Sequence, residues 1–213
     1  MAYSIKEMYY TLQGEGAQTG RPAVFCRFSG CNLWTGRERD RAKAICQFCD
    51  TDFVGIDGPN GGRFSEADEL AAAVDALWPS HPDAAAPKLV VCTGGEPLLQ
   101  LDSPAIKALQ ARGFMVAVET NGTQIAPSEL DWICVSPKAR ADFIQRAGQE
   151  LKLVFPQENL LPEMLPDVDF EHFYLQPMDG PNQAENTALA VEYCLANPRW
   201  KLSLQTHKYI GID

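Results

Sequence analysis

Short apolar runs alternate with amphipathic segments along most of the chain. The apolar runs predict buried strands, and the segments between them place apolar residues at helical spacing. Predicted strands cover residues 23–28, 88–92, 114–118, 132–135, 151–154, 172–175 and 201–204, and predicted helices cover residues 65–78, 103–112 and 182–195. Continuously apolar strands separated by helices are typical of a parallel sheet covered by helices, an α/β fold. The pattern leaves open whether this sheet is doubly wound or forms a closed or partial barrel.

Local residues mark the expected helix ends. Ser65 is the predicted N-cap of the first helix, with Asp68 as the acidic member of its capping pattern. Ser103 is predicted to open the second helix, with Pro104 at its first helical position, and Gly113 is predicted to end it.

The length and the loops indicate a single domain. The chain has 213 residues, enough to bury a sizeable core without cross-links. Turn-forming residues predict surface loops over residues 55–63 and 79–87, and neither is long enough to act as a domain linker. We therefore expect one domain over residues 1–213.

Charge and hydropathy exclude some classes of protein. The chain has 18 basic and 28 acidic residues and a net charge of −10, which argues against nucleic acid as a partner. No apolar run approaches the roughly 20 residues that span a bilayer. The first residues lack the pattern of a signal peptide. We therefore expect a cytoplasmic protein, in a compartment where thiols stay reduced.

Small, polar or charged residues follow six of the predicted strands. The carboxyl ends of parallel strands meet at one edge of a sheet, where α/β proteins place their sites. Each of these segments alone is an ordinary loop, but together they predict one shared functional rim. The segments are residues 29–31 with 46–51, then 93–97, 119–122, 136–138, 176–179 and 205–208.

Cys31, Cys46 and Cys49 form a C-x14-C-x2-C pattern. A structural zinc site, a redox pair and an iron–sulfur cluster held by three thiolates all remain open, because cysteine spacing alone decides little. A closed zinc site needs four ligands, and none of the three histidines has ligand spacing with these cysteines. A redox C-x-x-C pair leaves Cys31 unexplained. The other cysteines are expected in the core: Cys26, Cys92, Cys134 and Cys194.

The cysteine triad, followed by Thr93-Gly94-Gly95-Glu96-Pro97, resembles the radical S-adenosylmethionine (SAM) superfamily. Essentially the whole chain resembles one family within it, the 7-carboxy-7-deazaguanine synthases. The closer resemblance rests on Leu12-Gln13-Gly14-Glu15-Gly16, Arg27, Asp50-Thr51, Glu119-Thr120-Asn121-Gly122, Ser136-Pro137-Lys138 and Gln176-Pro177-Met178-Asp179.

One feature departs from the superfamily pattern. Most members have C-x3-C-x2-C, whereas here the Arg- and Lys-rich residues 32–45 separate the first two cysteines. The resemblance implies an α/β fold that is a trimmed, partial parallel β/α barrel of the radical SAM type. It also implies a single core domain with an expanded cluster-binding loop around residues 29–63.

The resemblance implies an enzyme, a carbon–nitrogen lyase. It would convert 6-carboxy-5,6,7,8-tetrahydropterin to 7-carboxy-7-deazaguanine with loss of ammonia, in queuosine and 7-deazapurine biosynthesis, which serves tRNA modification. Cys31, Cys46 and Cys49 would hold a [4Fe-4S] cluster whose open iron binds SAM, and Thr51 would bind Mg²⁺. Implied SAM-binding residues are Phe48, Cys49, Asp50, Gly95, Glu96, Ser136, Pro137, Lys138, Gln176, Pro177, Met178 and Asp179. Gly94 and Gly95 would permit close approach of the backbone to a ligand.

The implied substrate has a carboxylate and a pterin edge rich in hydrogen-bonding groups. Arg27 lies in an otherwise apolar strand, where an unpaired cation is costly, and it suits carboxylate capture; a structural ion pair is the alternative. The carboxylates of the tail, residues 210–213, are also expected within reach. Implied substrate-binding residues are Leu12, Gln13, Gly14, Glu15, Arg27, Thr93, Glu119 and His207, although a lone histidine is often structural.

The resemblance further implies a homodimer and an electron donor such as flavodoxin, with no membrane partner. Two rival hypotheses remain at this point. A glycyl-radical-enzyme activase would share the cluster and residues 94–96 but act on a protein. A zinc-stabilised, non-catalytic binding module would bind zinc and ignore SAM. The segment 13–16 and Arg27 favour the synthase.

Overall fold

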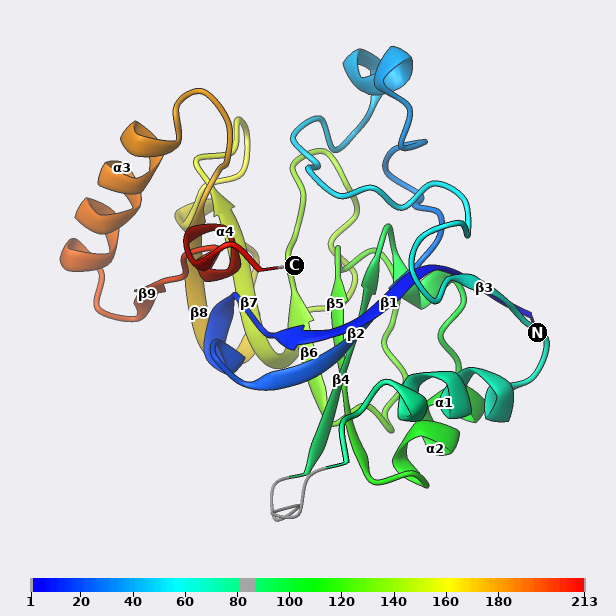
Figure 1. Cartoon of the computed structure of the whole chain (residues 1–213). Helices are drawn as coiled ribbons and strands as arrows, with labels where there is room; N and C mark the ends of the chain where they lie inside the picture. Colours follow the sequence, from blue (N-terminus) through cyan, green and yellow to red (C-terminus); the bar gives the residue numbers. More distant parts are fainter. Residues whose placement is uncertain (1, 81–86, 213) are drawn as a thin grey trace.

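The computed structural model describes residues 2–80 and 87–212, and within them it contains nine strands in one sheet (Figure 1). The strands are β1 Tyr3–Leu12, β2 Pro22–Phe28, β3 Gly62–Phe64, β4 Lys88–Gly94, β5 Phe114–Thr120, β6 Trp132–Val135, β7 Ala147–Phe155, β8 Asp169–Pro177 and β9 Trp200–Leu202. The helices are α1 Ala67–Ala76, α2 Ser103–Gln110, α3 Gln183–Ala196 and α4 Thr206–Ile210. All the predicted strands and helices are confirmed, with ends that differ by a few residues.

The sheet order is β3-β1-β2-β4-β5-β6-β7-β8-β9. From β2 to β9 every neighbouring pair is parallel, whereas β1 is antiparallel to both β2 and β3. Since β3 and β9 are not paired with each other, the sheet does not close. The α/β fold with an incomplete parallel barrel is therefore confirmed.

The antiparallel edge was not predicted. In β1 buried and half-exposed residues alternate, with Tyr3, Ile5 and Met8 buried, so the strand lacks the continuous apolar run that marks a parallel strand. The predicted loop 55–63 ends in β3, which pairs with the start of β1. Of the predicted loop 79–87, residues 81–86 lie outside the described residues, as does His81.

Side chains alternate between the two faces of the sheet. One face packs against the helices: Val90 and Cys92 of β4 belong to the core with α1 and α2, and Leu151 and Leu153 of β7 belong to the core with α3. Figure 1 accordingly shows α1 and α2 beside one part of the sheet and α3 beside the other. The opposite, inner face carries a small apolar cluster on β2, β4 and β5, formed by Ala23, Leu89, Val91 and Ala117. Inner-face positions nearer the carboxyl ends are polar, which makes this face the place for a site.

Two details of helix capping were predicted wrongly. The N-cap of α1 is Glu66, which forms a capping box with Glu69, so Ser65 and Asp68 do not have the expected roles. Ser65 instead donates to the Glu69 carboxylate, which satisfies its hydroxyl outside the helix.

The second helix shows a similar one-residue shift. The N-cap of α2 is Asp102, whose side chain accepts from the amide of Ala105, and Ser103 is already helical. Either neighbour can cap by local hydrogen bonding, and Asp102 is further fixed by Tyr3 Oη at 2.7 Å. Among the described residues, no helix has both the length and the apolar character needed to cross a membrane.

Candidate functional site

A cavity of about 640 Å³ lies on the inner face at the carboxyl ends of the strands. It is lined by residues that follow each of the six strands predicted to end at one rim, although residues 29–31 of the predicted rim are not among them. The predicted site residues that line it are Leu12, Gln13, Gly14, Glu15, Arg27, Cys46, Phe48, Cys49, Asp50, Thr51, Thr93, Gly95, Glu119, Ser136, Lys138, Gln176, Pro177, Asp179 and His207. Four predicted residues are not part of its lining: Cys31, Glu96, Pro137 and Met178.

Strand register brings the polar side chains together. Arg27 of β2 pairs with Thr93 of β4, and Cys92 of β4 pairs with Val118 of β5, so the next residues, Thr93 and Glu119, also share a face. In parallel strands, residues in register point to the same face. The pairing therefore places the guanidinium, the hydroxyl and the carboxylate on the inner wall of the cavity.

Arg27 has partners in this structure. Its Nε donates to Glu7 Oε1 at 2.8 Å, and its Nη2 donates to Tyr9 Oη at 2.8 Å. Both partners come from β1 and line the cavity beside it. These two bonds orient the guanidinium plane. The bond to Glu7 is the structural ion pair that the sequence analysis gave as the alternative for Arg27. The side chain still lines the cavity, so a structural ion pair and a role in ligand binding are compatible for Arg27.

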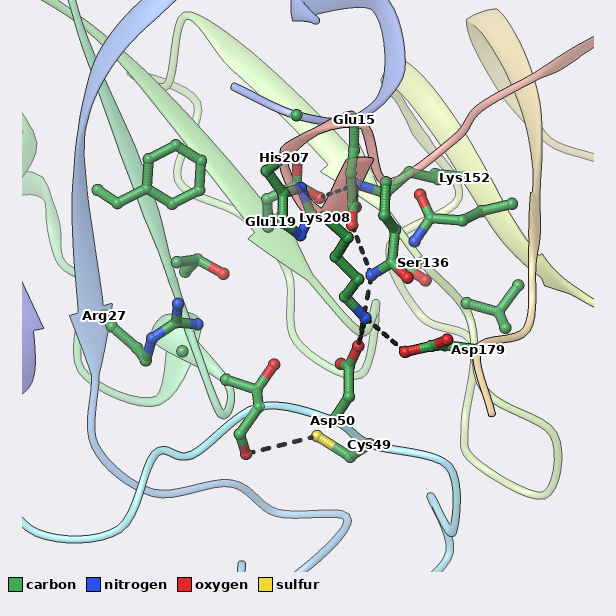
Figure 2. A pocket seen from close by; sticks show the side chains of 18 of the residues that line it. Glu15, Arg27, Cys49, Asp50, Glu119, Ser136, Lys152, Asp179, His207 and Lys208 are labelled. Carbon is green, nitrogen blue, oxygen red and sulfur yellow. Dashed lines mark hydrogen bonds and ion pairs between the residues drawn. The ribbon is translucent and has the colours of Figure 1, made fainter. Parts of the chain in front are cut away.

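Glu15 and Glu119 converge on Lys152, which the sequence analysis did not single out. Lys152 Nζ lies 2.7 Å from Glu15 Oε2 and 2.9 Å from Glu119 Oε2. Figure 2 shows this lysine between the two carboxylates, on the cavity wall. Burial raises the pKa of Glu15, but the charge and hydrogen bond of Lys152 more than offset this effect, so the pKa lies below its ordinary value. Glu15 is therefore an ionised acceptor.

Cys46 and Cys49 line the cavity, and Cys31 lies near enough to Cys49 to interact with its charge. Hydrogen bonding between Cys46 and Cys49 lowers the pKa of Cys49 to about 6 and raises that of Cys46. Burial raises the pKa of Cys31, which also senses the charge of Cys49. All three are free thiols. Such a set of sulfur donors, with one acidic thiol, fits the thiolate chemistry of an iron–sulfur cluster.

The described residues offer a poorer set of ligands for a single metal ion. Among residues 2–80 and 87–212, no three His, Cys, Asp or Glu side chains are grouped closely enough to hold one. That arrangement is unlike a closed zinc site, which brings four ligands onto one ion. Thr51 lines the cavity two residues after Cys49, but it has no acidic cluster around it to mark a magnesium site.

Gly94 and Gly95 line the cavity and also pack tightly against a neighbouring segment of the protein. A Cβ on Gly94, which has φ +135°, would lie 2.1 Å from the carbonyl oxygen of Phe28. A Cβ on Gly95 would lie 2.1 Å from the carbonyl oxygen of Gly30 and 2.8 Å from the Cβ of Cys31. The glycines are thus required because the loop after β4 packs on the segment that carries Cys31.

Glu96 lies behind the cavity wall. Its side chain is fully buried and accepts hydrogen bonds from Thr120 Oγ1 at 2.8 Å and from the amides of Asn121 and Leu98. Burial raises the pKa of this carboxyl. In this structure Glu96 joins the loops after β4 and β5, and Thr120 and Asn121 present the lining surface in its place.

Lys138 links the loop after β6 to the cysteine loop. Its Nζ donates to Ser136 Oγ at 2.6 Å and lies 5.7 Å from the ring centroid of Phe48. Its positive charge favours the thiolate form of both cysteines: it adds to the lowering of the Cys49 pKa, and it partly opposes the rise of the Cys46 pKa that the hydrogen bond with Cys49 and burial cause. Lys138 therefore contributes a cation beside the thiols, as well as lining the cavity.

The short helix α4 closes one side of the cavity. Lys208 bonds to Asp50 at 2.7 Å and to Asp179 at 2.6 Å, and Figure 2 shows it reaching between the two carboxylates. His207 packs against Gly14, where a Cβ would lie 2.1 Å from its Nδ1. The lining also includes Ile212, while Asp213, with the tail carboxylates, lies outside the described residues.

Several lining residues were missed by the sequence analysis. Lys152 carried a usable signal, because it interrupts the apolar run 151–154 in the way that Arg27 interrupts 23–28. Glu7 and Tyr9 had none, because β1 itself was not predicted. Gln205 and Lys208 lie in the segment 205–208 that was named as part of the rim, but only His207 was chosen from it.

Comparisons of sequence and structure find known proteins that are similar to this chain over its full length. It is 67% identical over 212 residues to the 7-carboxy-7-deazaguanine synthase of Caulobacter vibrioides and 63% identical over 212 residues to that of Bordetella pertussis, with 100% of both chains covered in each case. The structure matches the crystal structure of QueE from Escherichia coli with a TM-score of 0.71 and 28% identity, covering 97% of this chain and 95% of that one. No protein-family model matches. The chain belongs to the family of 7-carboxy-7-deazaguanine synthases, which are radical SAM enzymes with an iron–sulfur cluster and SAM as cofactors.

Proposed function

We propose that this chain converts 6-carboxy-5,6,7,8-tetrahydropterin to 7-carboxy-7-deazaguanine with loss of ammonia. The observation that carries the proposal is the single cavity that brings the Cys46–Cys49 loop together with Arg27 and the Glu15–Lys152–Glu119 group. The relatives that share the full length of the chain bear the name of this activity. A protein-directed activase has less support, because the polar groups converge in one cavity of about 640 Å³, a size that suits a small molecule.

Cys31, Cys46 and Cys49 would hold the [4Fe-4S] cluster, and the lining residues around them would hold SAM. When bound, these cofactors supply one-electron cleavage of SAM and hydrogen-atom abstraction from the substrate. The protein contributes a cation beside the thiols through Lys138, and it excludes water by packing α4 over the cavity. The proposed SAM-binding residues in the lining are Phe48, Cys49, Asp50, Gly95, Ser136, Lys138, Gln176, Pro177 and Asp179.

The remaining predicted SAM residues would act from outside the lining. Glu96 would act by holding Thr120 and Asn121 in place. Pro137 and Met178 would act through their backbone position beside lining residues. Gln157 helps to fix the backbone of Pro137, because its Nε2 donates to the Pro137 carbonyl oxygen at 3.2 Å.

Substrate recognition would divide between the two ends of the cavity wall. Arg27, oriented by Glu7 and Tyr9, would bind the substrate carboxylate, since a guanidinium offers paired donors to a carboxylate. Gln13, Glu15, Glu119 and His207 would bind the pterin edge, with Leu12, Gly14 and Thr93 completing the wall. Mg²⁺ would bind Thr51 together with substrate oxygens and water, because a single hydroxyl is too weak a ligand set alone.

The partners follow from the same proposal. An electron donor such as flavodoxin would approach the cysteine loop, where Arg37, Arg39 and Lys43 form an exposed basic stretch in a chain of net charge −10. A homodimer is proposed as the assembly, since closed two-fold dimers are the commonest. The seven free thiols support a reducing, cytoplasmic location. We also propose that residues 1–213 form one core domain with an expanded cluster-binding loop around residues 29–63.

The proposal is tested by anaerobic analysis of iron, sulfide and zinc, followed by electron paramagnetic resonance with and without SAM and then by pterin turnover. We expect four irons per chain, a signal that changes when SAM is added, and formation of the deazapurine with ammonia. Cys46→Ala should lose the iron and the turnover but keep its circular dichroism, whereas Cys194→Ala, on α3 away from the cavity, should keep all three. Zinc without iron, and no response to SAM after reconstitution, would refute the proposal.

A further inference from the structure

Lys152 is a buried cation whose position in the cavity wall is fixed by the sheet. It lies on β7 between Leu151 and Leu153, which point to the helix-covered face, so its side chain points to the inner face. Only 5% of the side chain is exposed. Its ammonium group bonds both Glu15, from the loop after β1, and Glu119, from β5. One lysine therefore joins three separate segments of the chain at the cavity.

The two carboxylates are held at both oxygens. Glu15 Oε2 faces Lys152, and its Oε1 accepts from Gln205 Nε2 at 3.0 Å. Glu119 Oε2 faces Lys152, and its Oε1 accepts from Gln13 Nε2 at 3.3 Å. Each carboxylate oxygen has a second lone pair, so both groups keep acceptor capacity toward the cavity that they line.

The surroundings of Lys152 are strongly acidic. Glu150 lies two residues away on the same face, is 2% exposed, and accepts from the amide of Ala17 at 3.1 Å. The Cys134 thiol from β6 lies near Lys152, and His207 from α4 lies near Glu15. Burial lowers the pKa of Lys152, but the acidic groups outweigh this and raise it well above its ordinary value. The lysine is thus a permanent cation within this group.

We propose that Lys152 is a positioning residue for substrate recognition, which holds Glu15 and Glu119 in place as paired acceptors for the N–H groups of an aminopyrimidinone edge. The inference rests on the proposed function and names the part of the cavity wall that reads the ring. An ionised carboxylate only accepts hydrogen bonds, whereas a protonated one presents a donor to a donor-rich edge. Two fixed acceptors therefore select a ring edge with adjacent N–H and NH₂ groups.

Removal of the cation gives a specific signature. In Lys152→Met the burial of Glu15 remains but the main group that lowers its pKa is gone, so this pKa rises. Protonated Glu15 then accumulates as the pH falls. We expect the KM for the pterin to rise by about 30-fold near neutral pH and to decrease again as the pH is raised, while the KM for SAM changes by less than about threefold. Lys152→Arg keeps the charge but displaces it. Its KM for the pterin should therefore rise less than in Lys152→Met, and by the same factor at every pH.

The test measures kcat and both KM values for the cluster-loaded wild type, Lys152→Met and Lys152→Arg between about pH 6 and about pH 9, a range set by the shifted carboxyl. A merely structural role would raise both KM values, or raise the pterin KM equally at every pH, and either result overturns the proposal. If Lys152→Met does not fold, the double variant Lys152→Met/Glu15→Gln is used instead, because it removes one buried negative charge together with the positive charge of the lysine. This variant is compared with Glu15→Gln alone, and equal pterin KM values would then overturn the proposal.

A second readout separates this inference from the proposed function. Infrared difference spectra of the same proteins, without substrate, should show a protonated carboxyl band of Glu15 near neutral pH in Lys152→Met, beyond the absorption of the wild type. Lys152 also lowers the pKa of Glu150, so the band is assigned to Glu15 by the part of it that is lost in Lys152→Met/Glu15→Gln. If the wild type fails to turn over the pterin, the proposed function fails while this band still reports on Lys152. If the wild type turns over and no band appears in Lys152→Met, the role of Lys152 is refuted alone.

Discussion

Lys208 Nζ lies 2.7 Å from the carboxylate of Asp50 and so joins the C-terminal helix α4 to the loop that follows Cys49. The same ammonium group reaches Asp179 after β8 at 2.6 Å. Three segments that are distant in the sequence thus meet at one cation. Since α4 also carries His207 and follows Gln205, the position of these two candidate substrate ligands depends on this contact.

Lys208→Met is expected to weaken substrate binding more than it weakens the fold. The ion pairs are partly exposed, so their loss should cost no more than about 1 kcal/mol of unfolding free energy. Loosening α4 should nevertheless raise the pterin KM by about fivefold, because local order at the cavity has a smaller free energy than the whole fold. Steady-state kinetics and thermal unfolding measure both effects. Lys107→Met, whose lysine pairs with Glu129 on the surface, is the control and should leave both unchanged.

The contribution of Lys208 to stability should depend on pH in the acid range. The hydrogen bond from Lys208 lowers the pKa of Asp179 below its ordinary value of 3.8. A carboxyl with a lowered pKa in the folded state stabilises the protein above its ordinary pKa, and this stabilisation is lost as the pH falls through the lowered pKa. The difference in thermal midpoint between the wild type and Lys208→Met should therefore be constant above about pH 5 and shrink below about pH 4. A difference that stays constant down to about pH 3 would contradict the assignment.

Arg27→Lys should separate carboxylate capture from structural pairing. Lysine keeps the charge beside Glu7 but lacks the paired donors of the guanidinium. We expect the dissociation constant of the pterin to rise about tenfold, or about 1.4 kcal/mol, with little change for SAM. Isothermal titration with each ligand measures this, and Arg63→Lys on the exposed edge strand β3 serves as the matched control. Equal losses for both ligands would show that Arg27 supports the fold of the cavity and does not contact the carboxylate.

Gly14→Ala tests the contact between the loop after β1 and α4. The new Cβ would overlap His207, which must then shift together with its helix. We expect the pterin KM to rise about tenfold at nearly unchanged SAM affinity, because overpacking displaces the neighbour. Gly62→Ala is the control, since its Cβ would meet only the ring of Phe64 at 3.8 Å, and it should behave like the wild type. If Gly14→Ala has normal kinetics, His207 does not depend on its present position for function.

The order of strands and helices was determined by local sequence. Apolar runs such as 88–92 form strands wherever both faces are buried, and this pattern needs no knowledge of the partner strand. The strand β1, which carries Glu7 and Tyr9, was not predicted because its buried and half-exposed residues alternate and form no continuous apolar run. The ends of α1 and α2 were misplaced by one or two residues because neighbouring polar residues compete for the cap, and only tertiary contacts such as Tyr3 with Asp102 choose between them.

The identity of the site residues also came largely from the sequence, since strand-end motifs gather at one edge in a parallel sheet. What each side chain does there was decided by tertiary structure alone. Glu96 bonds to Thr120 and Asn121 behind the wall, and Lys152 bonds to Glu15, which is 137 positions away in the chain. The physical reason is that strand periodicity fixes which face a residue takes, whereas burial and hydrogen-bond partners arise from segments that meet only when the sheet forms.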